Sequence, residues 1–305
     1  MLKYIIRRLF LGLFTVFAVT TITFFLLFLV PGGPFLAEKA PSEEVIAELN
    51  ARYGLDKPRV VQYKNYMVNL LKGDFGVSLK RREYTVKEII MSGFVVSARL
   101  GVLAILIAVI FGMIGGVLAA YYHGKFLDNL LVLFSTWGVA VPSFITTIVF
   151  LLFFCVKLSI FPIMGLFSPL HYVLPVTCLA FYPTAYIMRL VRISMLDVLG
   201  QDYIRTARAK GLSTFKIIFK HALRNALLPV ITYLGPTLAW ILIGNFVIEK
   251  VFNIPGIGMA LISATLGRDY PLIMGITIFL AFIIVLMNIL VDILYKIIDP
   301  RIRLV

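Results

Sequence analysis

Five long runs without a charged residue constrain this chain more than any other feature. Each run has 22 to 27 residues, and the runs are Leu9–Val30, Leu100–Tyr122, Leu130–Val156, Asn225–Ile248 and Tyr270–Val291. A helix of about 20 apolar residues spans a bilayer. The composition agrees, because 61% of the 305 residues are hydrophobic and only 14% are charged, against about 25% charged in an average soluble domain. The sequence therefore predicts an all-α, polytopic membrane protein.

A sixth span is expected between Lys157 and Arg189, where no residue is charged. Prolines and a glycine in 162–169 interrupt the first part of this stretch, which leaves His171–Met188 as a short helix. The first run is longer than the apolar region of a secretory signal, which has about 7 to 15 residues. We therefore expect six transmembrane helices, the first of them retained.

The basic residues predict the orientation. With residue 1 in the cytoplasm, six spans place 15 of the 29 Lys and Arg residues in cytoplasmic segments. The short external connections carry few basic residues, and the external loop 32–93 is too long to be governed by the positive-inside rule. Both termini are thus expected in the cytoplasm. Since this topology accounts for the net charge of +14, we expect no nucleic-acid partner.

The external loop is expected to fold as a subdomain. A first helix is predicted to begin near residue 43, and a second helix to run from Arg59 to Lys72. Thr85 and Glu88 have the spacing of a capping box at the start of the next helix. A loop of this kind either contacts a partner or only connects two spans.

Small and helix-breaking residues lie inside the predicted spans. Gly112 and Gly116 have the Gly-x-x-x-Gly spacing that lets two helices approach closely. Prolines inside the spans are expected to interrupt their helices, and such breaks are compatible either with a transport path or with kinks that serve packing. These prolines are Pro142, Pro175, Pro183, Pro229 and Pro236. Cys155 and Cys178 both fall inside spans, so neither a disulfide nor a metal site is indicated.

The segment 201–225 is predicted to be a basic, amphipathic hairpin on the cytoplasmic side. Its apolar residues recur at helical spacing and have basic residues between them. Gly211 breaks the helix in the middle. Such a hairpin either lies on anionic lipid or inserts an apolar ridge into a groove of a soluble partner.

This segment resembles the cytoplasmic loop of binding-protein-dependent ABC importers, which docks on the ATPase subunit. That loop carries a Glu-Ala-Ala pattern, then Gly, then Ile-x-Leu-Pro. Here the run Arg205–Ala207 precedes Gly211 at the family spacing, and His221–Arg224 stands where Ile-x-Leu-Pro would fall. Both departures are typical of the peptide and nickel branch of the family.

The resemblance covers nearly the whole chain. The order of the short motifs looks like that of the first membrane subunit of an oligopeptide importer, and the motifs are Pro31-Gly32, Tyr53–Leu55, Gly73–Gly76, Pro142–Phe144, Pro255–Gly258, Arg268–Tyr270 and Asp299–Arg301. It implies the type I ABC importer permease fold in the bacterial inner membrane. The implied segments are 1–31 with the first span, the external subdomain 32–94, the five-helix core 95–299 with its coupling loop 193–224, and the tail 300–305.

The resemblance also implies the function, which is to form half of a peptide translocation pathway. The expected partners are a second similar permease, two ABC ATPases, an external substrate-binding protein and the bilayer. The segment 202–223 would couple to the ATPase through Arg205, Thr206, Ala207, Arg208, Gly211, Leu212 and Phe215. Pro255, Gly256 and Gly258 would form the external mouth.

The chain is not expected to be an enzyme. It has no Walker-type phosphate loop, so no catalytic residue, metal or cofactor is assigned to it, and ATP and Mg would be bound by the partner ATPases. The alternative is an ion-coupled secondary transporter that works without an ATPase. Such a transporter predicts inverted repeats and ionisable groups near the bilayer centre, and the sequence shows no clear repeat and no central carboxylate.

Overall fold

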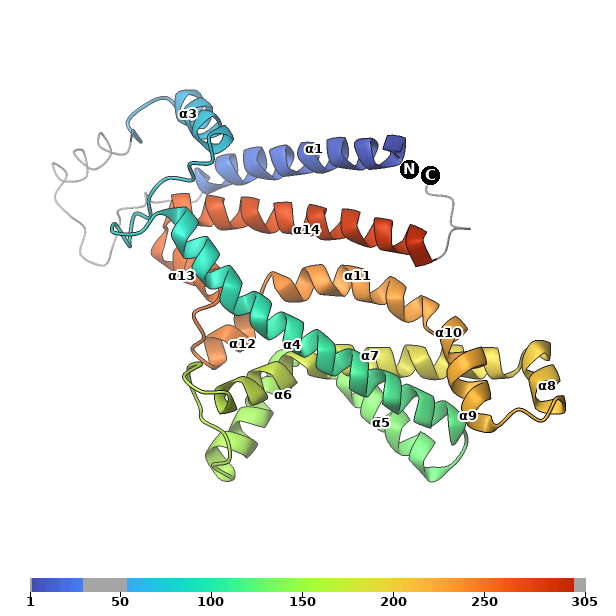
Figure 1. The fold of residues 1–305 in the computed structure, drawn as a ribbon. Coiled ribbons are helices and arrows are strands. Elements are labelled where there is room, and N and C mark those ends of the chain that lie inside the picture. The colour runs from blue at the N-terminus through green and yellow to red at the C-terminus, as the bar shows by residue number, and fades with distance from the viewer. Residues whose placement is uncertain (1, 30–53, 299–305) are drawn as a thin grey trace. The chain divides into compact units, whose positions relative to one another are not determined.

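The computed structural model describes residues 2–29 and 54–298 and places most of them in helices (Figure 1). The α-helices are α1 (Leu2–Leu27), α3 (Arg59–Leu71), α4 (Val86–Tyr121), α5 (Phe126–Ala140), α6 (Ser143–Phe150), α7 (Leu170–Leu199), α8 (Asp202–Ala209), α9 (Thr214–Lys216), α10 (Leu223–Ala226), α11 (Leu228–Leu242), α12 (Phe246–Val251), α13 (Ile257–Gly267) and α14 (Tyr270–Ile298). Two π-helical segments, η1 (Leu151–Lys157) and η2 (Ile217–Ala222), continue α6 and α9. The all-α prediction is confirmed.

Within the described residues, five helical segments are long and apolar enough to cross a membrane. They are the main part of α1, α4, α7, the stretch Leu228–Val251 that holds α11 and α12, and α14. The bent pair formed by α5 and α6–η1 makes a sixth if it counts as one span. The total of six then agrees with the number predicted from the sequence.

Two of the spans differ from the helices expected. The run Leu130–Val156 is not one straight helix, because its two halves are bent by 109° at the break before Ser143. Pro142 lies in this break, and proline has no N–H to donate and a ring that clashes with the preceding turn. The predicted helix His171–Met188 is only the first part of α7, which begins at Leu170 and continues to Leu199.

The N-terminus of α4 has the capping box that the sequence predicts. The Thr85 N–H donates to Glu88 Oε2 (2.8 Å), and the Glu88 N–H donates to Thr85 Oγ1 (3.2 Å), so the capping box is confirmed. The helix it opens has 36 residues, about 54 Å at 1.5 Å per residue and longer than a bilayer core of about 30 Å. The helix predicted over Arg59–Lys72 is confirmed as α3. The helix predicted near residue 43 lies outside the described residues.

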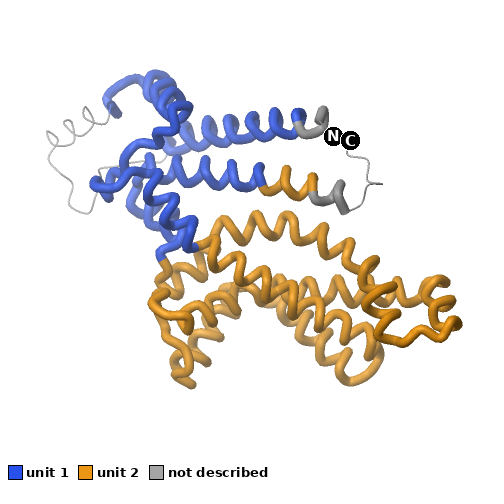
Figure 2. The backbone as a smooth tube through the Cα atoms, in the orientation of Figure 1, with its two compact units in different colours: residues 1–96, 255–286 blue, residues 97–254, 287–305 orange. Residues whose placement is uncertain are grey.

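The chain forms two compact units, which Figure 2 colours separately. Unit 1 combines residues 1–96 with 255–286, and unit 2 combines 97–254 with 287–305. Helices α4 and α14 each contribute to both units.

In unit 1, Asp269 ties the segment after α3 to the start of α14. Its side chain is buried, and its carboxylate accepts hydrogen bonds from the Ser78 hydroxyl and from the N–H groups of Leu79 (3.1 Å) and Lys80 (3.3 Å). The same carboxylate accepts from the Leu272 N–H (3.4 Å) in the first turn of α14. One carboxylate therefore caps a helix and holds a loop nearly 190 residues away in sequence.

In unit 2, the Gly-x-x-x-Gly spacing brings α4 against α7. A Cβ placed on Gly112 would lie 2.8 Å from Ile187 Cβ, and one placed on Gly116 would lie 2.7 Å from the Met188 carbonyl oxygen. No real Cβ approaches a backbone atom so closely, so only glycine permits this contact. The close approach of two helices at this motif, which the sequence predicts, is confirmed.

A larger side chain at this contact is expected to destabilise unit 2. We expect Gly116→Leu to lower the stability by about 2–3 kcal/mol, because Met188 and the Val191 side chain leave no room for it. Thermal unfolding of the purified protein in mild detergent measures this. The control is Gly200→Leu, since the nearest atom to a Cβ there is 3.5 Å away. Equal unfolding midpoints for the two variants would contradict the packing role of Gly116.

Candidate functional site

The segment after α7 folds as the predicted hairpin. Its first arm is α8, and its second arm is α9, η2 and α10 (Figure 1). Gly211 lies between them with φ of 73°, a left-handed conformation that glycine adopts without steric cost. The Gly211 N–H donates to the Arg208 carbonyl (2.9 Å) and the Leu212 N–H to the Ala207 carbonyl (3.3 Å), which is the Schellman pattern at a helix end.

The inner face of the hairpin is closed by apolar packing and one polar contact. Ile204 and Ala222 are fully buried, and Ile217 is nearly so. The side-chain amide of Asn225 donates to the Tyr203 hydroxyl (2.8 Å) and joins the two arms. Side-chain contacts between its two arms therefore stabilise the hairpin, in addition to its connections to the neighbouring helices.

The outer face carries an exposed aromatic pair. Phe215 is 70% exposed and Phe219 is 51% exposed, and their ring centroids are 4.5 Å apart. The single apolar stripe expected from the sequence is thus divided, because alanine and isoleucine side chains pack inward while the two phenylalanines point away. Exposed basic residues surround the pair in the sequence, namely Arg205, Arg208, Lys210, Lys216 and Lys220.

The residues predicted to contact an ATPase differ in how far they are exposed. Exposed members of the set are Arg205, Thr206, Arg208, Gly211 and Phe215, and Leu212 is half-buried. Ala207 is only 6% exposed, so the chain itself covers it and it offers almost no surface to a partner. The hairpin surface therefore consists of guanidinium groups, a glycine turn and aromatic rings.

The residues predicted for an external mouth lie at the start of α13. Pro255 is exposed, whereas Gly256 and Gly258 are buried. Gly256 is the N-cap residue of α13, and a Cβ placed on Gly93 of α4 would lie 3.2 Å from the Gly256 carbonyl carbon. Gly93 accordingly lets α13 start against the backbone of α4, and of the three predicted mouth residues only Pro255 is exposed.

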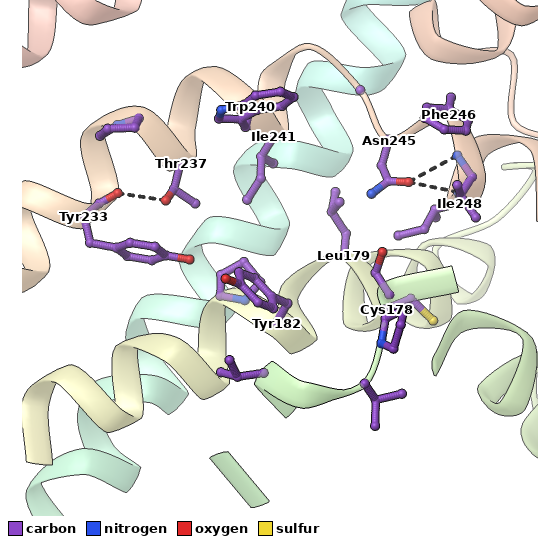
Figure 3. Close-up of a pocket in the computed structure, with 18 of the residues that line it drawn as sticks. Cys178, Leu179, Tyr182, Tyr233, Thr237, Trp240, Ile241, Asn245, Phe246 and Ile248 are labelled. Carbon is purple, nitrogen blue, oxygen red and sulfur yellow. Dashed lines mark hydrogen bonds between the residues drawn. The ribbon is translucent and has the colours of Figure 1, made fainter. Parts of the chain in front are cut away.

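Unit 2 also contains a cavity of about 880 Å³ that the sequence did not reveal. Its walls come from α5, α6, α7, α11 and α12. The residues labelled in Figure 3 are those contributed by α7, by α11 and by the start of α12. Pro142, Pro183 and Pro236, each from a different span, line it together. Gly244 lines it too, with φ of 90° at the break between α11 and α12.

Prolines from three spans and one helix break share this cavity. A bilayer tolerates broken helical backbone where protein covers it or where a water-filled cavity solvates it. Pro142 and Gly244 lie at breaks between helices, whereas Pro183 and Pro236 lie inside α7 and α11, and all four residues line the one cavity. Scattered prolines were the only signal for it in the sequence, and they do not say which of them meet.

Two family models and several known proteins match this chain. The family described as "binding-protein-dependent transport system inner membrane component" matches residues 112–304, and the N-terminal model of the same family matches residues 1–85. The dipeptide transport system permease protein DppB of Bacillus subtilis is 47% identical over 304 residues, which are 100% of this chain and 99% of that protein. The oligopeptide transport system permease protein OppB of Haemophilus influenzae is 46% identical over 99% of this chain and 100% of that protein.

A solved structure shows the same fold. A chain of the MetNI methionine ABC transporter, in an inward-facing conformation, matches with a TM-score of 0.59 and 16% identity. The match covers 70% of this chain and 97% of that one. The expected fold of an ABC importer permease is therefore confirmed. By the match of both family models and of full-length relatives, the chain belongs to the family of inner membrane components of binding-protein-dependent transport systems.

Proposed function

We propose that this chain is the permease subunit of an ATP-driven peptide importer and forms half of its translocation pathway. The names of the relatives support peptides as the substrate, since the similar proteins are dipeptide and oligopeptide permeases. The other half of the pathway comes from a second, similar permease. The substrate arrives on an external binding protein.

The hairpin 202–223 couples the pathway to an ATPase. The observation that carries this step is the exposed pair Phe215 and Phe219 on a hairpin whose inner face is already packed. Water-exposed aromatic rings on a fixed support are typical anchors for a pocket in a partner. The two partner ATPases bind ATP and Mg. Their closure acts on the pathway because the hairpin contacts the ATPase differently in its open and its closed state.

The orientation of the chain follows from this coupling. An ATPase that uses cellular ATP sits in the cytoplasm, so the hairpin faces that side. With six spans, both termini then lie there as well, and the segment tied down by Asp269 faces outward. The segment 54–85 and Pro255 are accordingly the parts open to the external binding protein.

Co-purification from the native membrane tests this proposal. We expect the tagged chain, extracted in mild detergent, to bring with it a second permease, P-loop ATPases and a peptide-loaded external protein, all identified by mass spectrometry. Deleting the gene is expected to abolish uptake of a labelled tripeptide. Recovery of a lone protein or a homodimer without an ATPase would instead support the ion-coupled transporter.

A further inference from the structure

Helix α3 packs against the C-terminal end of α1, at a level that still belongs to the span (Figure 1). The Tyr63 hydroxyl shares a hydrogen bond with Thr21 Oγ1 (2.7 Å). The centroid of the Tyr63 ring lies 5.3 Å from that of Phe24 and 5.5 Å from that of Phe25. The span runs to Leu27, so Thr21 lies about 9 Å inside its end at 1.5 Å per residue. Helix α3 therefore lies at the edge of the hydrocarbon layer.

A second side of α3 is apolar and exposed. None of the 13 residues of this helix is buried. Its exposed apolar side chains recur at the spacing of one helix face, which we call the apolar face of α3, and they are Val60, Val61, Val68 and Leu71. Exposed apolar side chains continue on α1 at the same level, namely Ile22, Leu26 and Leu29. An apolar face in this place is typical of a helix that lies in the membrane interface.

The charges beside the apolar face are all basic. No acidic residue lies between Asp56 and Asp74, and the basic residues of the same stretch are Lys57, Arg59, Lys64 and Lys72. The Arg59 guanidinium lies 5.5 Å from the centroid of the Phe28 ring. The three lysines are exposed, and the described residues provide no acidic partner for them. Their charges are therefore available to an anionic ligand.

Lys64 lies within the apolar face, one helical turn from Val60 and one from Val68. A lysine in such a place lays its carbon chain along apolar surface and extends its ammonium group toward water and head groups. The ligand that fits this helix is therefore apolar where it meets the valines and anionic where it meets the lysines. An anionic phospholipid has this chemistry, because its phosphate lies directly above its acyl chains.

We propose that α3 is an interfacial helix that binds anionic phospholipid in the external leaflet. Its apolar face lies among the upper parts of the acyl chains, and the three lysines bind the lipid phosphates. The polar side of the helix, with the exposed Asn65 and Asn69, stays in water. This role does not depend on which solute the chain transports, and only the word external rests on the proposed orientation.

Photo-crosslinking identifies what covers the apolar face. The photoreactive residue p-benzoylphenylalanine replaces Val60 or Leu71, which are 72% and 85% exposed and so lose little packing. Asn69 is the control on the polar side of the same helix, and Leu13, exposed inside the span of α1, is the positive control for lipid. After illumination of membranes that contain the full chain, mass spectrometry is expected to find phospholipid adducts at Val60, Leu71 and Leu13, and none at Asn69.

Neutral variants test the head group. The chain, purified with the proteins that accompany it, is reconstituted in vesicles of phosphatidylethanolamine and phosphatidylglycerol. When Lys57, Lys64 and Lys72 are all changed to Gln, we expect the ratio of phosphatidylglycerol to phosphatidylethanolamine adducts at Leu71 to fall at least about tenfold. The matched control changes three exposed basic residues of the segment after α3 to Gln and is expected to keep the ratio, and these residues are Lys80, Arg81 and Arg82.

Three results would overturn the inference. Adducts with another polypeptide at Val60 and Leu71 would assign the apolar face to a protein partner. No adduct at either position, with lipid adducts at Leu13, would place the face in water. An unchanged lipid ratio in the lysine variant would show that the lysines do not bind anionic head groups. Lipid adducts on the apolar face together with a lysine-dependent ratio support the inference.

Discussion

Replacing Phe215 and Phe219 together by alanine is expected to lower peptide uptake at least about tenfold, the loss typical of removing an aromatic anchor worth 2 kcal/mol or more. Both rings are more than half exposed, so their removal takes away little internal packing. What the substitutions remove is the proposed interaction of the two rings with the ATPase. Uptake of a labelled tripeptide, the amount of chain in the membrane and the ATPase recovered with the tagged chain measure the effect.

The matched control is another exposed phenylalanine. Phe167 is 89% exposed and lies in the connection before α7, which the proposed orientation places outside. We expect Phe167→Ala to leave uptake and ATPase recovery unchanged. The coupling role of the pair is contradicted if the double variant transports within about twofold of wild type, or if Phe167→Ala loses as much.

Removing the carboxylate of Asp128 is expected to destabilise unit 2 by about 3–5 kcal/mol, the cost typical of breaking a buried ion pair from one side. Asp128 is 1% exposed, and it accepts hydrogen bonds from Arg192 Nε (2.6 Å) and Arg192 Nη2 (2.9 Å). It also accepts from the Gly124 N–H (2.9 Å). Asp128→Ala leaves the Arg192 guanidinium, itself mostly buried, without this partner.

A double-variant cycle separates this pair from ordinary packing. Arg192→Ala is expected to cost a similar amount, and the variant with both changes is expected to lose less than the sum. His123→Ala is the control, because His123 is 60% exposed and its Nδ1 lies 3.1 Å from Asp128, a contact worth about 1 kcal/mol. Thermal unfolding in mild detergent measures all four variants. Additive losses would show that Asp128 and Arg192 do not act as a unit.

Local sequence rules predicted much of this fold because a bilayer permits few kinds of backbone structure. The charge-free runs predicted the spans, since a segment in hydrocarbon must satisfy its backbone as a helix. The capping box of Thr85 and Glu88 and the turn at Gly211 were predicted correctly because each depends only on neighbouring residues. The same holds for the close approach at Gly112 and Gly116, for which small size is the only requirement.

Tertiary structure decided which residues are available for function. Ala207 and Phe215 both belong to one apolar pattern, yet the first is buried and the second exposed. Ala207 lies on the covered side of α8, whereas Phe215 belongs to the second arm of the hairpin and lies on its uncovered side. Helix α13 escaped prediction because its 11 residues are too few for a span. The sequence also has no local signal for the hydrogen bonds that the N–H groups of Leu79 and Lys80 donate to Asp269, because the partners are far apart in the chain.

The sequence by itself determined the fold class, the number of apolar spans, the hairpin after α7 and the family, because apolar runs, turns and ordered motifs are local properties. Only the tertiary structure decided that Pro142, Pro183 and Pro236 face one cavity with a neutral wall. The physical reason is that a proline disturbs a helix locally, whereas the packing of five helices decides which space each proline faces.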